Sequence, residues 1–199
     1  MSLATQPIKS ATHDNLQAEI HYDTDPSKPD TACTITYNSR SRYTLGNTMA
    51  DEHEDEDIAR KVRDNEYIGM PVFAYVHGSV AIQAAYANPF HCPWDSGRSG
   101  WAYMTKAEVR SHYGVRRITK RVKEQALSLL RSCVEEYSAY LNGECYGFII
   151  RDTSTGEAVD SCWGYYGMDF VEQEALSALK QMESITPLQM ELFKEGEAA

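Results

Sequence analysis

Apolar residues along this 199-residue chain recur at two spacings, one typical of strands and one typical of helices. Short runs in which every second residue is apolar or β-branched, bounded by Gly, Pro, Asn or Asp, are typical of antiparallel strands. Seven runs follow this pattern: 18–22, 32–37, 71–77, 80–86, 101–104, 145–151 and 157–163. The short connections after the third and the sixth of these runs predict two hairpins.

Helical spacing predicts three further helices after the acidic run described below. The longest spans residues 119–142, beginning at a capping threonine and ending before Gly143. Thr105 and Glu108 form a capping box, in which the hydroxyl and the carboxylate bind free backbone N–H groups, so we expect a short helix to follow. Asp169 is predicted to cap the last helix.

These elements predict an α+β fold in a single domain, which we place at residues 17–186. We expect a mostly antiparallel sheet of about five to seven strands, with the long helix 119–142 and the C-terminal helix packed on one face. Residues 1–16 show no periodicity and are predicted to form a mobile N-terminal tail, while residues 187–199 are predicted to form an acidic C-terminal tail.

Several classes of protein are disfavoured by composition. The chain has no run of about 20 apolar residues, so no membrane span is expected, and its N-terminal residues lack the pattern of a secretory signal. Five cysteines without paired spacing argue against a zinc ribbon and a disulfide scaffold, which favours a reducing cytoplasm. No Walker or dinucleotide motif is present, and we predict neither a metal nor a cofactor.

The net charge of −10 is unevenly distributed. Residues 106–134 carry eight bases and two acids, whereas the flanking regions are acidic. Two interpretations stay open: this basic segment is solvated or lies on the acidic surface of the same chain, or it binds a phosphate-bearing partner. Its candidate binding residues are Arg116, Arg117, Lys120 and Arg121.

The acidic run 51–57 contains six carboxylates and precedes a helical pattern that ends in Arg and Lys. This order suits the helix dipole, which predicts an acidic helix N-terminus. A loop that binds a divalent cation is the alternative, although the glycine-centred spacing of an EF-hand is missing. Asp55, Glu56 and Asp57 are the candidate binding residues in this run.

The stretch 89–100 is too apolar for a solvated linker and too rich in Pro and Gly for a helix or strand, so we predict an ordered loop that holds a site. The segment 160–167 repeats its combination of Asp-Ser, Cys, Trp and Gly. We expect the two segments to meet and to shape one surface. Its predicted binding residues are Trp94, Asp95, Trp163, Tyr165 and Tyr166.

The same two segments contain the groups of a nucleophilic site. A cysteine beside an imidazole and a carboxylate could act as a nucleophile, and the candidates are Cys92, His91, Asp95, Cys162 and Asp160. A papain-type enzyme needs a histidine far downstream of its cysteine, and no histidine follows residue 112. The structural alternative is that the two tryptophans pack while the aspartates accept backbone N–H groups in turns. We therefore expect a binding protein rather than an enzyme.

Several short motifs together resemble a family of uncharacterised small acidic proteins of bacteriophages and other mobile elements. The resemblance covers roughly residues 40–170. The motifs are Arg42-Tyr43-x-Leu45-Gly46, Pro71-Val72-x-x-Tyr75-x-His77, Pro89-Phe90-x-Cys92-Pro93-Trp94-Asp95-Ser96-Gly97-x-x-Gly100, Arg117-Ile118-x-Lys120, Glu136-Tyr137-x-x-Tyr140-Leu141-x-Gly143 and Asp160-Ser161-Cys162-Trp163-Gly164-x-Tyr166-Gly167. It carries over no catalytic residue, and it implies a role in the cytoplasm of a host bacterial cell.

In that context we predict a counter-defence protein, of the anti-CRISPR or antirestriction kind, that inhibits a host effector by direct binding. Carboxylates could substitute for phosphates at a basic channel of the effector. The expected partner is a host defence protein or a ribonucleoprotein complex, with indirect contact to nucleic acid, and homodimer formation through opposite charges stays open. One alternative is a cysteine-dependent, hydrolase-like enzyme centred on Cys92 or Cys162. The other is a nucleic-acid-binding accessory protein that uses the basic segment 106–131, through Arg110, Arg116, Arg117, Lys120, Arg121 and Lys123.

Overall fold

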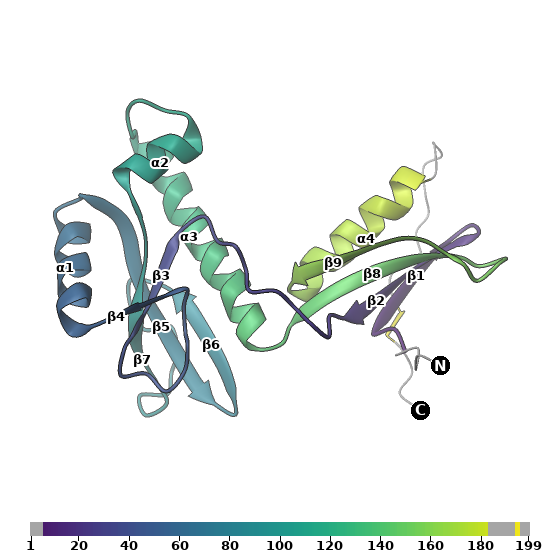
Figure 1. Cartoon of the computed structure of the whole chain (residues 1–199), viewed down its shortest axis with the longest axis horizontal. Helices are drawn as coiled ribbons and strands as arrows, with labels where there is room; N and C mark the ends of the chain where they lie inside the picture. Colours follow the sequence, from purple (N-terminus) through teal and green to yellow (C-terminus); the bar gives the residue numbers. More distant parts are fainter. Residues whose placement is uncertain (1–5, 183–193, 196–199) are drawn as a thin grey trace. The chain divides into compact units, whose positions relative to one another are not determined.

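The computed structural model describes residues 6–182 and 194–195, and these form two compact units (Figure 1). The terminal unit consists of Met1–Ser27 and Gly143–Ala199, and the central unit consists of Lys28–Asn142. Each unit has its own sheet and its own buried apolar cluster. The two units are described separately below.

The central unit contains a five-stranded sheet with the order β4-β3-β7-β5-β6. All neighbouring strands pair antiparallel except β3 and β4, which are parallel. Its strands are β3 (Thr34–Asn38), β4 (Thr48–Ala50), β5 (Tyr67–His77), β6 (Ser79–Ala84) and β7 (Ser96–Thr105). The hairpin predicted around Gly78 is the β5–β6 pair, in which His77 lies opposite Ser79.

Helices cover both faces of this sheet, since α1 (Glu52–Arg63) and α3 (Lys120–Leu141) lie on opposite sides of it (Figure 1). The third helix, α2 (Lys106–Tyr113), follows β7 directly and begins with the predicted Thr105–Glu108 capping box. The apolar side of α3 packs mainly against β6 and also against β5 and β7, and its Leu130 and Val134 are fully buried. Burial of this stripe accounts for much of the core of the central unit.

The terminal unit contains an antiparallel sheet with the order β10-β1-β2-β8-β9 and one helix. Its elements are β1 (Lys9–His13), β2 (Leu16–Tyr22), β8 (Cys145–Asp152), β9 (Ala158–Tyr166), α4 (Met168–Met182) and β10 (Lys194–Glu195). The helix packs on β2, β8 and β9, where it buries Val171, Ala175 and Leu179 against Ile20 and Phe148. The predicted hairpin after residue 145 is the β8–β9 pair.

The structure confirms the α+β class and the mostly antiparallel pairing predicted from the sequence. The strands belong to two sheets, however, and the long helix and the C-terminal helix pack on different sheets. The reason is that β2 pairs with β8, more than 100 residues later, and a strand pattern alone does not reveal such distant partners.

Three further expectations need correction or comment. Residues 9–13, predicted to belong to a mobile tail over 1–16, form β1 and pair with β2 along its whole length. Asp169 lies inside the first turn of α4, which begins at Met168, rather than before it. Of the predicted tail 187–199, only residues 194–195 are described, and they pair with β1. Among the described helices, none has the length and apolar character that a membrane span requires.

Candidate functional site

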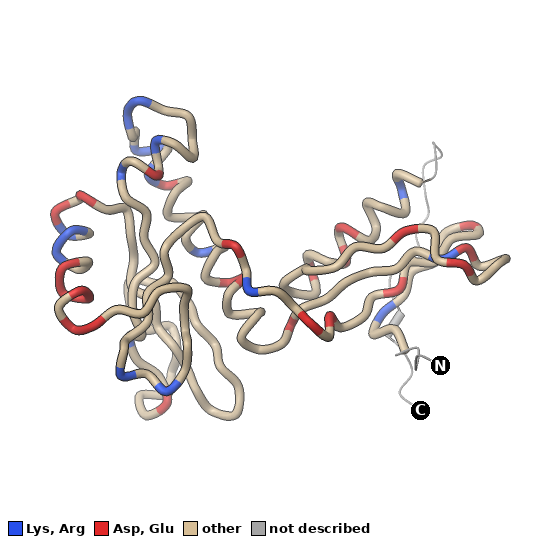
Figure 2. The backbone as a smooth tube through the Cα atoms, viewed as in Figure 1, with Lys and Arg blue, Asp and Glu red and all other residues tan. Residues whose placement is uncertain are grey.

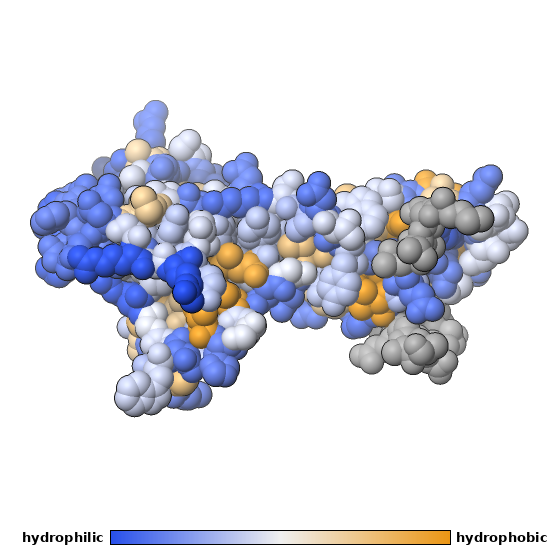
Figure 3. All heavy atoms as spheres, turned by 60° about the horizontal axis from the view of Figure 1, so that its bottom comes forward, coloured by the Kyte–Doolittle hydropathy of each residue, from blue (hydrophilic) through white to orange (hydrophobic). Residues whose placement is uncertain are grey.

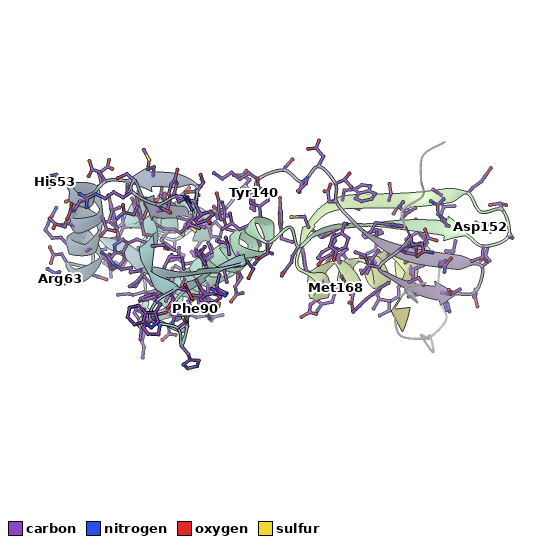
Figure 4. All side chains as sticks on the ribbon, turned by 90° about the horizontal axis from the view of Figure 1, so that it is seen from below. His53, Arg63, Phe90, Tyr140, Asp152 and Met168 are labelled. Atoms are coloured by element: carbon purple, nitrogen blue, oxygen red, sulfur yellow. The ribbon has the colours of Figure 1, made fainter. Side chains whose placement is uncertain are left out.

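The predicted loop 89–100 is partly strand, because β7 already begins at Ser96. Residues 85–95 connect β6 to β7 in the central unit, and Phe90 projects with this loop away from α1, whose ends carry His53 and Arg63 (Figure 4). The loop is held by its own side chains. Ser96 Oγ donates to the Cys92 carbonyl at 2.5 Å, and Asn88 Nδ2 donates to Ser96 Oγ at 2.9 Å.

Asp95 lies at the centre of the polar groups of this loop. Its Oδ2 accepts the Cys92 thiol at 3.2 Å and lies 3.2 Å from Nδ1 of His77, at the end of β5. A nucleophilic cysteine needs a base beside it that takes its proton, with the carboxylate behind that base. Here the carboxylate lies between the thiol and the imidazole, so the geometry does not favour cysteine catalysis at Cys92.

The other predicted residues of the loop face solvent. The Trp94 side chain is 92% exposed, so it does not pack as the structural alternative expected. His91 is also exposed and contributes no contact to the Asp95 cluster among the described residues. An exposed tryptophan on an ordered loop is available to a partner, which is compatible with its predicted role in binding.

The segment 160–167 belongs to the other unit, at the end of β9. The Trp163 ring lies over Gly147 of β8, where an added Cβ would come within 2.2 Å of the ring, and Trp163 stays 46% exposed. Asp160 accepts the Ser161 N–H at 2.8 Å, but it does so inside β9 rather than in the turn that the structural alternative expected. Cys162 is exposed, and the described residues place no histidine within hydrogen-bonding distance of its thiol.

The two tyrosines of this segment have structural partners. Tyr165 stacks on Phe148 and meets the edge of Phe170. Burial and, to a lesser extent, a hydrogen bond with Cys162 raise the pKa of the Tyr165 hydroxyl. The Tyr166 hydroxyl donates to the Ser27 carbonyl at 2.7 Å. Since Trp94 and Trp163 belong to different units, a surface shared by the two segments stays a prediction.

The acidic run 51–57 forms the start of α1, as its dipole-compatible pattern predicts, and the surface over this helix is strongly hydrophilic (Figure 3). Asp51 is the N-cap, and it forms a capping box with Glu54. Asp55 Oδ2 accepts from Arg98 at 2.6 Å. Asp57 pairs with Lys61 and Arg60, and these hydrogen bonds lower the pKa of its carboxyl.

Three of the six carboxylates of the acidic run form ion pairs, because Glu52 also pairs with Arg40 at 3.0 Å. Asp51 and Glu54 bind backbone N–H groups of the capping box, and among the carboxylates of the run only Glu56 has neither an ion pair nor a hydrogen bond in the described part of the chain. No group of three His, Cys, Asp or Glu side chains that could hold a metal ion occurs among the described residues. The divalent-cation interpretation therefore has no geometric support.

Many basic residues of the central unit line a single pocket, whereas the carboxylates of the acidic run are spread along α1. A pocket of about 400 Å³ lies where α2, the loop 114–119 and the first turn of α3 meet the turn before β5. Figure 2 shows the Lys and Arg positions of α2, of this loop and of the start of α3 gathered in one region of the central unit. The basic pocket is lined by Lys106, Arg110, Arg116, Arg117, Lys120 and Lys123, together with Asn65, Ile68, Ile118 and Thr119.

Local sequence explains how this pocket forms. Gly114 ends α2 in the left-handed conformation, at φ 62°, which a residue without a Cβ adopts readily. The chain then reverses, and Thr119 restarts a helix by accepting the Val122 N–H at 3.3 Å. Because only six residues separate the two helices, the cations of both helices and of the connection lie at one end of the unit.

Comparisons of the chain with protein-family models, with curated proteins and with solved structures give no match. The resemblance to acidic phage proteins therefore stays a prediction, and the site has to be interpreted from its own geometry.

Most cations of the basic pocket have no acidic partner. Among the described residues, Lys106, Arg110, Arg116 and Arg117 form no ion pair. Lys120 lies 3.9 Å from Glu124, and Lys123 Nζ donates to the Asn65 side chain at 2.8 Å. Elsewhere in the chain, Arg40, Arg60, Lys61, Arg98 and Arg151 each pair with a carboxylate.

The sequence identified part of this pocket. Of the four predicted basic residues, Arg116, Arg117 and Lys120 line it, whereas Arg121 does not. Arg110 and Lys123, which the nucleic-acid alternative also named, line it as well. Lys106 completes it, and its place in the basic segment was the available signal. Asn65 comes from the turn before β5 and Ile68 from the start of β5, and nothing in their local sequence connects them with a segment about 50 residues later.

Proposed function

We propose that the protein binds nucleic acid through the basic pocket. The observation that carries this proposal is that four cations without acidic partners line one pocket in a chain of net charge −10. Bringing like charges together costs free energy unless an anion is bound, and the central unit carries 14 acidic side chains that could neutralise its 15 basic ones. The cations are left free, which is the arrangement expected of a site for phosphate groups.

The first turn of α3 adds to this argument. It contains no acidic residue, whereas the first turns of α1 and α2 each contain at least one. Instead, Lys120 and Lys123 stand where the helix dipole is positive. Thr119 accepts the Val122 and Lys123 N–H groups, and the two N–H groups before them have no partner within the helix. A bound phosphate would satisfy those N–H groups and neutralise the lysines at the same time.

The shape of the site favours a polymer over a small anion. Its cations come from α2, from the connecting loop and from α3, and the Lys120 side chain is almost fully exposed. Ile118 lines the same pocket and offers an apolar contact for a sugar or a base. A chain of phosphates can contact such spread cations one after another, and the affinity then depends steeply on salt.

The experiment is a titration of the full-length protein with a fluorescent single-stranded oligonucleotide at several salt concentrations. If roughly four cations each contact one phosphate, the slope of log K against log salt is about −3, which weakens binding roughly 60-fold between 50 and 200 mM salt. Binding that ignores salt, or no binding at 50 mM salt, would refute the proposal.

The same titration separates this function from the cysteine enzyme. Cys92→Ala and Cys162→Ala change neither the basic pocket nor its net charge, so both variants should bind the oligonucleotide as the wild type does. Loss of binding in a correctly folded cysteine variant would instead connect the function with the chemistry of a thiol rather than with the pocket.

A counter-defence role stays a possible setting for this binding, and the structure changes how it would work. The pairing of Asp55 and Asp57 with Arg and Lys disfavours mimicry of DNA by the acidic run. Inhibition of a CRISPR or restriction complex would then use the basic pocket on the guide RNA or the DNA that the complex holds. Whether such a complex is the partner is a question for affinity capture from a host lysate.

A further inference from the structure

The terminal unit ends in a sheet edge that no described strand covers. In the order β10-β1-β2-β8-β9, β9 is the last strand, and only one of its sides pairs, with β8. Between the two bulges of this pair, residues 160–163 keep a regular antiparallel register with β8. Every second N–H and C=O group of a regular edge strand points away from the sheet, where another strand can pair with it.

The exposure of β9 is unusual for a strand of nine residues. All residues from Ala158 to Gly164 are exposed, although side chains of a strand point alternately to the two faces of the sheet. Two of them are large apolar residues, Val159 at 50% and Trp163 at 46% exposure. Both faces beside this edge are therefore open to side chains of an added strand.

The usual protections of a sheet edge are largely missing from β9. Edges are commonly blocked by lysine, by proline or by a bulge in the middle of the strand. The sequence of β9 contains neither lysine nor proline, and the bulges lie outside residues 160–163. Asp160 is its single charge, and its carboxylate accepts the Ser161 N–H at 2.8 Å.

The charge of the terminal unit indicates the kind of partner. Residues 1–27 and 143–199 carry 15 acidic and 4 basic side chains, whereas residues 28–142 carry 14 and 15. Beside the edge itself, Asp160 on β9 and Glu157 just before it are both acidic. A second copy of the chain would bring the same acidic strand to this edge, and like charges on facing strands are unfavourable.

We infer that the β9 edge is a docking site for an extended, lysine- or arginine-bearing segment of a partner protein, which adds to the sheet as a sixth strand. Main-chain hydrogen bonds to residues 160–163 would supply affinity, and the partner's cations would face Asp160 and Glu157. Apolar residues at alternate positions of the partner segment would contact Trp163 and Val159. This site lies in the other unit from the basic pocket and does not depend on it.

The experiment uses a labelled peptide of about ten residues, close to the length of β9, in which lysine alternates with valine and threonine. Its binding to the full-length protein is followed by fluorescence anisotropy. Ser161→Pro removes the N–H that the Asp160 carboxylate accepts and that an added strand would take over from it, and proline is tolerated at the edge of a sheet. The matched Ser161→Ala keeps that N–H. We expect roughly tenfold weaker binding to Ser161→Pro and wild-type binding to Ser161→Ala.

Two further peptides make the outcome decisive even if Ser161→Pro fails to fold. A peptide of the same sequence and charge, N-methylated along its pairing edge, should lose binding to the wild type, because it cannot donate main-chain hydrogen bonds. A peptide with glutamate in place of lysine should bind weakly. Equal binding of the methylated and unmethylated peptides would overturn the inference and leave only non-specific charge attraction. Self-association that Ser161→Pro abolishes, with no peptide binding, would instead assign the edge to a second copy.

Discussion

The double variant Arg116→Glu/Arg117→Glu should bind a single-stranded oligonucleotide at least roughly 100-fold more weakly than the wild type at moderate salt. Both residues line the basic pocket and form no ion pair in the described residues, so their guanidinium groups are available to phosphates. Each charge-assisted contact that is lost contributes about 1.5–3 kcal/mol, and the new carboxylates repel the phosphates as well. Anisotropy titration measures the change.

The control for this variant changes the net charge equally at positions outside the pocket. Arg42 and Arg63 are exposed residues of the same unit that make no ion pair among the described residues and do not line the basic pocket. Arg42→Glu/Arg63→Glu should weaken binding only slightly, because long-range attraction is screened within about 10 Å at 0.1 M salt. Equal losses in the two double variants would show that net charge rather than the pocket determines binding.

The second large effect is expected in the core of the central unit, where Leu130→Ala should cost about 2–5 kcal/mol of stability. Leu130 is fully buried in the stripe of α3 that packs against the sheet. Truncation removes buried apolar area and leaves a cavity that the sheet fills only in part. Because the chain has two compact units, hydrogen exchange of the β5 and β7 amides is a better measure than a single unfolding transition.

A neighbour on the same helix serves as the comparison for Leu130. Leu127 is only partly buried against the same cluster, so Leu127→Ala should cost clearly less. The expected ranking is therefore a large loss of exchange protection in β5 and β7 for Leu130→Ala and a smaller loss for Leu127→Ala. A similar loss for both, or protection in β5 that does not change in either, would contradict the packing described for α3.

Local chemistry made much of the secondary structure predictable. The Thr105–Glu108 capping box, the capped helix over 119–142 and the two hairpins follow from residues within a few positions of one another, and the structure has all of them. The start of β7 was missed because Gly97 and Gly100 look like loop residues. Gly100 is required there for another reason, since a Cβ would lie 2.1 Å from the Thr36 carbonyl of the neighbouring strand.

The arrangement of the strands into sheets could not be predicted, because it depends on pairing between distant parts of the chain. Nothing close to Leu16–Tyr22 indicates that this strand pairs with Cys145–Asp152, so the division into two sheets was not predictable from periodicity. The stretch 89–100 was predicted to hold a site because it combines Cys, His, Trp and Asp. In the structure, the Asp95 carboxylate lies between the Cys92 thiol and the His77 imidazole of β5, an order unsuited to nucleophilic catalysis. The basic segment contains no motif as specific as that of the stretch 89–100, yet the structure gathers its cations in one pocket. The sequence shows how many cations the segment holds, but not whether acidic side chains lie beside them.

The most direct measurement of the proposed site is the change in amide chemical shifts when isotope-labelled full-length protein is titrated with a single-stranded oligonucleotide. We predict that the largest changes occur at Lys106, at Arg110 and over residues 116–123, and that they diminish as salt is raised. The largest changes at residues 51–57 or 89–95, or none anywhere at low salt, would contradict the assignment of the basic pocket as a nucleic-acid site.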